Sequence, residues 1–124
     1  MSSAASVNSA FKEAEERWGR GPEKKLRLDV VINNAGYSLA GDTENATEKQ
    51  VERHMQTLFH GTARVTVRGV RSMREGAADG RGGLIINISS AAGLCAFPGT
   101  AYYHASKFAV EGFTESMARD VHPD

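Results

Sequence analysis

Two short apolar runs, at residues 28–32 and 84–88, limit the folds open to this chain more than any other feature. Both runs are rich in β-branched residues and are bounded by turn-forming residues, a pattern typical of strands in a parallel sheet covered on both faces. Residues 47–73, between the two runs, carry apolar side chains at helical spacing. Two strands joined by a helical crossover lie parallel, nearly always with a right-handed connection. The sequence therefore predicts an α/β fold.

A helix is also predicted before the first run. Apolar residues between Val7 and Trp18 fall on one helical face, and Gly19 ends that segment. In the middle helix, Thr47 and Gln50 have the spacing of a capping box, so we expect the helix to begin there.

The middle helix leads into a polar, glycine-rich loop at residues 76–83. A third helix is predicted over residues 102–119, with His122 and Pro123 marking its exit. The predicted order is helix, strand, helix, strand, helix. We find no linker or internal repeat, so residues 1–124 are expected to belong to a single domain.

The charge balance excludes several classes of function. Fifteen lysine and arginine residues face fifteen aspartate and glutamate residues, which removes the electrostatic attraction that non-specific binding to nucleic acid needs. Arg64, Arg68 and Arg71 form a basic stripe on the middle helix, a pattern usually found on a solvated face. No apolar run approaches the roughly 18 residues of a membrane span. We expect neither a nucleic-acid partner nor a membrane-spanning segment.

Metal binding and a secreted, disulfide-bonded protein are also not expected. Cys95 is the single cysteine, and the four histidines lack the paired spacings of a zinc site. The first eight residues carry neither positive charge nor the apolar stretch of a secretory signal. These features favour a reducing, cytoplasmic location.

Tyr103 and Lys107 are the most informative pair of polar residues. They are four residues apart in Tyr-His-Ala-Ser-Lys, which on a helix places both side chains on one face, one turn apart. An ammonium held near a phenol favours the phenolate, so Tyr103 could act as a general acid or base. Taken alone, the pair could equally be an ordinary contact on a helix surface.

Small and polar residues follow both predicted strands, and this strengthens the functional interpretation. Ser90 comes directly after the second strand, and residues 33–36 (Asn-Asn-Ala-Gly) follow the first. Open α/β sheets bind ligands at the carboxyl ends of their strands. The Ser90 hydroxyl could hydrogen-bond a substrate oxygen there, and small residues let a flat ligand approach the backbone closely.

Three of these segments together resemble the short-chain dehydrogenase/reductase family, which are NAD(P)-dependent oxidoreductases with a Rossmann fold. Residues 33–36 resemble the family's Asn-Asn-Ala-Gly motif, residues 87–90 (Asn-Ile-Ser-Ser) resemble the end of its fifth strand, and residues 103–107 match its Tyr-x-x-x-Lys signature. The 13-residue separation of Ser90 and Tyr103 is the one the family uses between catalytic serine and tyrosine. The resemblance implies a partial, doubly wound Rossmann-like fold.

The resemblance also implies roles for individual residues. Hydride would pass between the nicotinamide of NAD(P) and a small carbonyl or alcohol substrate, with Tyr103 as the acid or base and Ser90 positioning the substrate oxygen. Lys107 would both tune Tyr103 and hold the nicotinamide ribose. The residues expected to contact NAD(P) are Asn33, Ala35, Gly36, Tyr103 and Lys107. The two long helices commonly pair across a homodimer in this family.

The resemblance covers only the middle of the family's domain. The glycine-rich cofactor turn belongs after the family's first strand, and nothing before Asp29 supplies it. Gly76, Gly80 and Gly82 match the spacing of that turn, but they follow a helix and precede a strand, which is the reverse of the required order. The alternative to an enzyme is therefore a non-catalytic remnant or an interaction protein derived from the family.

A second departure lies in the middle helix. The family usually has an asparagine there that supports proton relay through an ordered water near the lysine, and Leu58 takes its place in this sequence. A leucine side chain cannot hydrogen-bond water. Either the relay is weakened or another group rebuilds it. His60 is one candidate, although a packing or surface role for His60 is the favoured interpretation.

Overall fold

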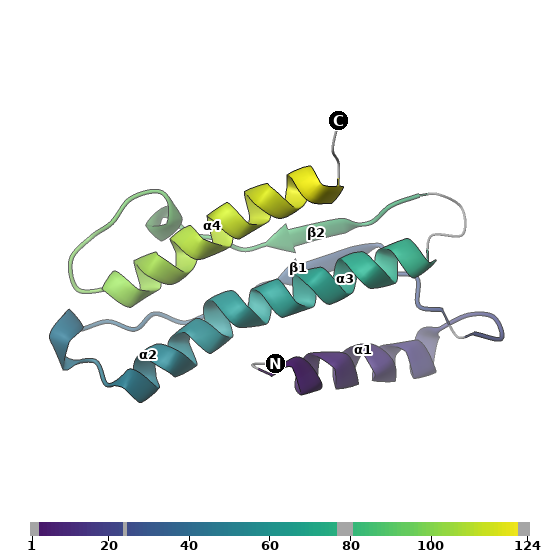
Figure 1. Ribbon diagram of the computed structural model, residues 1–124, viewed down its shortest axis with the longest axis horizontal. Helices are drawn as coiled ribbons and strands as arrows, with labels where there is room; N and C mark the ends of the chain where they lie inside the picture. Colours follow the sequence, from purple (N-terminus) through teal and green to yellow (C-terminus); the bar gives the residue numbers. More distant parts are fainter. Residues whose placement is uncertain (1–2, 24, 77–80, 122–124) are drawn as a thin grey trace.

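The computed structural model describes residues 3–23, 25–76 and 81–121 (Figure 1). The centre of the predicted glycine-rich loop and the predicted helix exit at residues 122–123 lie outside the described residues. The elements are, in order, α1 (Ala4–Trp18), β1 (Val30–Asn33), a 3₁₀ turn (Thr43–Asn45), α2 (Glu48–Met55), a π-helical turn (Gln56–Gly61), α3 (Thr62–Gly76), β2 (Leu84–Asn87), a second 3₁₀ turn (Ala91–Gly93) and α4 (Ala101–Val121).

Two helices begin at capping boxes. The predicted box of α2 is confirmed, because the Thr47 hydroxyl accepts a hydrogen bond from the Gln50 N–H and the Gln50 side chain accepts one from the Thr47 N–H. A second box, formed by Ser3 and Ser6, starts α1. Each box satisfies two N–H groups that a helix start otherwise leaves without partners.

The single middle helix expected from the sequence consists of α2, the π-helical turn and α3 in succession. Figure 1 shows them as one long rod. A π-helical turn widens the helix by one residue and shifts the faces of the segments on either side of it. The predicted long helix is therefore present, with π-helical geometry over Gln56–Gly61.

The two strands pair in parallel, which confirms the predicted α/β arrangement. The register runs from Val30 opposite Leu84 to Asn33 opposite Asn87. All three long helices lie on one face of this sheet. Val31 on that face packs against the core of α1 and α3, and the Asn87 side chain on the same face hydrogen-bonds Thr114 of α4.

The other face of the sheet is uncovered in the described structure. Its apolar side chains are exposed, and they are Val30, Ile32, Leu84 and Ile86. The sequence favoured strands covered on both faces, so this expectation holds for one face only. The uncovered face follows from the placement of α1, α3 and α4 on the same side.

The helices reach the sheet through a small core and a close backbone approach. Val7 and Phe11 of α1 and Val65 of α3 form a buried cluster. Further along α3, Gly69 lies against the sheet, because a Cβ atom at this position would lie 3.4 Å from Cδ1 of Ile85 and 3.5 Å from Cγ2 of Val31. The absence of a larger side chain lets α3 lie close to both strands.

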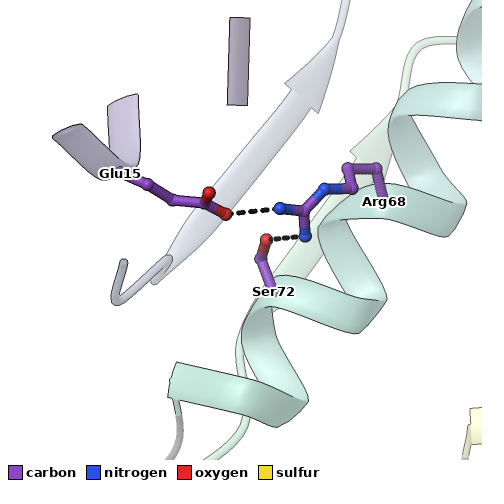
Figure 2. Close-up of polar contacts among 3 residues, drawn as sticks. All are labelled: Glu15, Arg68 and Ser72. Atoms are coloured by element: carbon purple, nitrogen blue, oxygen red, sulfur yellow. Dashed lines mark hydrogen bonds and ion pairs between the residues drawn. The ribbon is translucent and has the colours of Figure 1, made fainter. Parts of the chain in front are cut away.

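A charged contact joins α1 to α3 (Figure 2). The guanidinium of Arg68 forms an ion pair with Glu15, donates a hydrogen bond of 2.6 Å to the Ser72 hydroxyl, and lies over the Phe11 ring. The basic stripe on this helix was predicted to be solvated. Within it, Arg68 instead contacts α1, whereas Arg71 is exposed.

Two substitutions at Gly69 test this close approach. Gly69→Ala places the new methyl group at ordinary contact distance and improves helix propensity by about 1 kcal/mol, so we expect an unchanged or higher free energy of unfolding. Gly69→Leu overfills the same space, and we expect a loss of about 1–3 kcal/mol. Chemical denaturation followed by circular dichroism measures both. Equal stability of the two variants would contradict the close packing of α3 on the sheet.

Candidate active site

The candidate active site lies where β1 and β2 end. Because the strands are parallel, Asn33 and Asn87 occupy the same edge of the sheet, the edge at which open α/β sheets bind ligands. At this edge, residues 34–36 follow β1, and Ser89 and Ser90 follow the end of β2.

The Lys107 ammonium is anchored at this edge. Lys107 lies on α4, is only 7% exposed, and donates a hydrogen bond of 2.8 Å from Nζ to the carbonyl oxygen of Ile88. A Cβ atom on Gly36 would lie 4.0 Å from the same Nζ atom. Lys107 therefore lies next to the residues that leave both strands. Its bond to Ile88 uses one of the three N–H donors of an ammonium.

Tyr103 lies one turn before Lys107 on the same face of α4, as the sequence spacing predicts. The Lys107 Nζ atom is 5.8 Å from the centroid of the Tyr103 ring. The tyrosine is half-buried, whereas the ammonium is almost fully buried. Tyr103 thus keeps part of its surface exposed while a cation remains close to its ring.

Ser90 starts the 3₁₀ turn that connects β2 to α4. Its hydroxyl oxygen accepts a hydrogen bond of 3.2 Å from the Ala92 N–H, and its side chain is half-buried. The hydroxyl proton stays available as a donor while the oxygen caps the turn. Sequence reasoning placed Ser90 at this edge, and the structure confirms that location.

His104 holds the loop that carries Ser90, a role that the sequence did not indicate. Its Nε2 atom accepts a hydrogen bond of 2.9 Å from the Phe97 N–H, so the ring proton is on Nδ1, which lies 3.0 Å from the Ala92 carbonyl oxygen. Two hydrogen bonds from one buried ring thus join the loop to the residue next to Tyr103.

The residues expected to contact NAD(P) are in two environments. Ala35 and Gly36 are exposed beyond β1. The Asn33 side chain points instead toward the helices, where its amide donates to Asn87 Oδ1 at 2.8 Å and to Thr66 Oγ1 at 3.1 Å. A contact between Asn33 and a ligand at the strand edge would therefore have to come from its backbone.

Leu58 is 1% exposed and lies beside Gly36, where a Cβ atom would be 3.8 Å from its Cγ atom. The apolar side chain of Leu58 and the Lys107 ammonium thus both border Gly36. His60 is half-buried, and its ring centroid is 5.1 Å from that of Phe59. This contact supports the packing interpretation of His60.

His54, one turn before Leu58, was missed by the sequence reasoning. Its side chain is 0% exposed and neither ring nitrogen has a hydrogen-bond partner among the described residues. The ring centroid is 5.1 Å from that of Tyr37 and 6.1 Å from that of Tyr103. Burial, and secondly the charge of Lys107, lower the pKa of His54 below its ordinary value. The ring is therefore neutral near pH 7.

The described residues contain no group of three or more histidine, cysteine, aspartate or glutamate side chains placed to hold a metal ion. Among the helices of the same part of the chain, none combines the length and apolar character needed to cross a membrane.

Comparisons with known proteins agree with the geometry of the site. The short chain dehydrogenase family model matches residues 1–124. The oxidoreductase calM of Penicillium decumbens is 56% identical over 124 residues, which are 100% of this chain and 39% of that protein. A 3-ketodihydrosphingosine reductase of Bacteroides thetaiotaomicron is 45% identical over 97 residues, covering 78% of this chain and 35% of that protein.

A solved short-chain dehydrogenase from Streptomyces avermitilis superposes with a TM-score of 0.83 at 31% identity, over 98% of this chain and 42% of that structure. The chain thus spans about two fifths of the length of the relatives it matches. The family model, the similar solved structure and the placement of the Tyr-x-x-x-Lys pair at the strand edge agree. The chain belongs to the short chain dehydrogenase family, and its similarity to solved Rossmann-fold members confirms the family resemblance seen in the sequence.

Proposed function

We propose that this chain carries the proton-transfer part of an NAD(P)-dependent oxidoreductase acting on a carbonyl or alcohol substrate. The observation that carries the proposal is the position of Tyr103 and Lys107, one turn apart on α4, with the Lys107 ammonium bonded to the carbonyl of Ile88 at the ligand edge. A relative named as a 3-keto reductase supports a ketone as the substrate class.

The residues at the edge fit a nicotinamide cofactor. Lys107 has N–H donors beyond the one used on Ile88, and Gly36 leaves space beside its ammonium. We assign Ala35, Gly36, Tyr103, Lys107 and the backbone of Asn33 to hold the cofactor. When bound, NAD(P) supplies the hydride acceptor or donor.

The chain's own residues manage the substrate oxygen and its proton. In the reducing direction the Tyr103 hydroxyl donates its proton to the oxygen that gains negative charge, and the nearby Lys107 ammonium stabilises the resulting phenolate. The Ser90 hydroxyl donates a hydrogen bond to the same oxygen, which orients the substrate. Half-buried Tyr103 faces substrate, and buried Lys107 stays in place through its bond to Ile88.

Partners and location complete the proposal. A small carbonyl or alcohol compound is the expected partner, in a cytoplasmic setting. We also propose a homo-oligomer in which α3 and α4 of one copy pack against α3 and α4 of another. The exposed aromatic side chain of Phe108 on α4 supports this pairing. The rival hypothesis, a non-catalytic remnant of the family, is decided by assaying the purified protein with NADH and NADPH against a panel of ketones, aldehydes and alcohols.

Tyr103→Phe is the direct test of the proton-transfer role. The variant keeps the ring but loses the hydroxyl, so we expect turnover to fall by at least about 100-fold, with the dissociation constant of the nicotinamide cofactor within about twofold of the parent. Nucleotide absorbance measures turnover and nucleotide fluorescence measures binding. Tyr102→Phe, at the adjacent half-buried tyrosine on α4, is the matched control and should retain activity. A fully active Tyr103→Phe enzyme would refute the assignment.

Lys107→Met tests the double role of the ammonium. We expect both weaker cofactor binding and a rate lower by about 100-fold or more, because one charged group serves the ribose and the phenol. Lys12→Met, on the exposed surface of α1, removes the same charge far from the strand edge and should change neither quantity. Unchanged cofactor affinity in Lys107→Met, together with a slower rate, would show that Lys107 acts on Tyr103 alone.

A further inference from the structure

A buried histidine without hydrogen bonds lies beside the proposed catalytic pair. His54 is 0% exposed, and both Nδ1 and Nε2 lack partners among the described residues. Buried polar atoms in folded proteins nearly always have a partner, either in the protein or in an ordered water molecule. An imidazole with two unpaired nitrogens is therefore a site where a partner is expected.

The surroundings of His54 limit what that partner can be. The Tyr37 ring covers it from the loop after β1, the Tyr103 ring lies 6.1 Å away on α4, and apolar Leu58 follows one turn later on the middle helix. With no exposed surface, the imidazole can be reached only by something as small as water.

Lys107 supplies the second contact that a buried water needs. Its ammonium lies 5.8 Å from the centroid of the Tyr103 ring, and the centroid of the His54 ring lies 6.1 Å from the same point. The ammonium also has N–H donors besides the one given to Ile88. A water molecule can accept from the ammonium and donate to an imidazole nitrogen at the same time. Leu58 offers no polar atom for this purpose, and His60 packs on Phe59 instead.

We propose that His54 holds an ordered water molecule against the Lys107 ammonium and so fixes the position of the Lys107–Tyr103 pair. His54 is in this view a positioning residue, which acts through Lys107 and does not touch the substrate. The catalytic consequence of this proposal rests on the proposed function, whereas the presence of the water does not depend on it.

Protonation would disrupt this arrangement. A charged imidazole loses its acceptor nitrogen and places a second cation beside Lys107, so the linkage should fail as the pH falls below 6.5, the ordinary pKa of histidine, toward the lower pKa that burial gives His54. The titratable groups that face His54 are Tyr37, Tyr103 and Lys107.

The water is tested by NMR on the protein with ¹⁵N-labelled histidine. We expect His54 to be a single neutral tautomer at pH 7, with nuclear Overhauser contacts from its ring protons to a long-lived water. The signals should be lost in His54→Leu and kept in His60→Leu. A dry ring, or one that exchanges tautomers freely at pH 7, would overturn the proposal without bearing on the enzymatic function.

The positioning role is tested on a substrate found in the carbonyl and alcohol panel. We expect His54→Leu to lower kcat by up to about 100-fold while the KM for cofactor stays within about twofold. His54→Asn, which restores a polar atom, should recover part of the rate and lose the acidic limb of the pH profile assigned to His54, and His60→Leu should match the parent. Parental kcat and pH profile in His54→Leu would refute this role.

The two hypotheses fail in different ways. If Tyr103→Phe abolishes turnover and His54→Leu does not, only the role of His54 is refuted. If Tyr103→Phe remains active, the proposed function is refuted, and the NMR measurement still decides whether His54 holds a water. A higher thermal stability of His54→Leu with no loss of a water signal would identify His54 as an ordinary core residue.

Discussion

The backbone of Ile88 joins the sheet to the active site. Its N–H donates a hydrogen bond of 2.9 Å to the carbonyl oxygen of Asn33 in β1, and its own carbonyl oxygen accepts the bond from Lys107 in α4. Residue 88 lies just after β2, so its carbonyl is free of the strand ladder. A buried ammonium is costly unless it is hydrogen-bonded. The end of the strand supplies that partner, and α4 is therefore tied to the same residue, Ile88, whose N–H continues the pairing of β1 and β2.

A network of side-chain hydrogen bonds next to Ile88 fixes the register of the two strands. The Asn33 amide bonds Asn87 and Thr66, and the Asn87 amide donates to Thr114 at 2.9 Å, so both strands and both α3 and α4 share one set of hydrogen bonds. A shift of one strand along the other by one residue would turn the asparagine of the shifted strand to the opposite face, away from its partners. The network would then be lost together with the alignment of the ligand edge. The pairing of the strands and the placement of α4 are thus a single structural condition.

The sequence predicted the order of elements, the parallel pair and the common face of Tyr103 and Lys107, because each depends on local periodicity or on a spacing of four. It did not predict the buried face of the middle helix. Small and polar side chains form much of that face, and among them are His54, Thr62, Thr66, Gly69 and Ser72. Two of the apolar residues at helical spacing, Val51 and Val70, are only half-buried. The π-helical turn adds a shift of face that apolar spacing does not reveal. The environment of His54 depends on Tyr37 and α4, which are distant in the sequence, so only the folded chain reveals it.

The geometry of the proposed proton-transfer pair, Tyr103 and Lys107, is independent of the uncovered face of the sheet. Its contacts are the bond between Lys107 and Ile88 and the two His104 bonds to the loop after β2, and all of them lie at the strand ends or between that loop and α4. The exposed side chains of Val30, Ile32, Leu84 and Ile86 take part in none of these contacts. An apolar surface that covered this face would bury area and stabilise the strands, but it would not have to move Tyr103 or Lys107. A change in the strand pairing, by contrast, would move the site, because Ile88 and Asn33 belong to both the sheet and the site. The arrangement of the proposed catalytic pair therefore depends on the parallel register and not on what covers the open face.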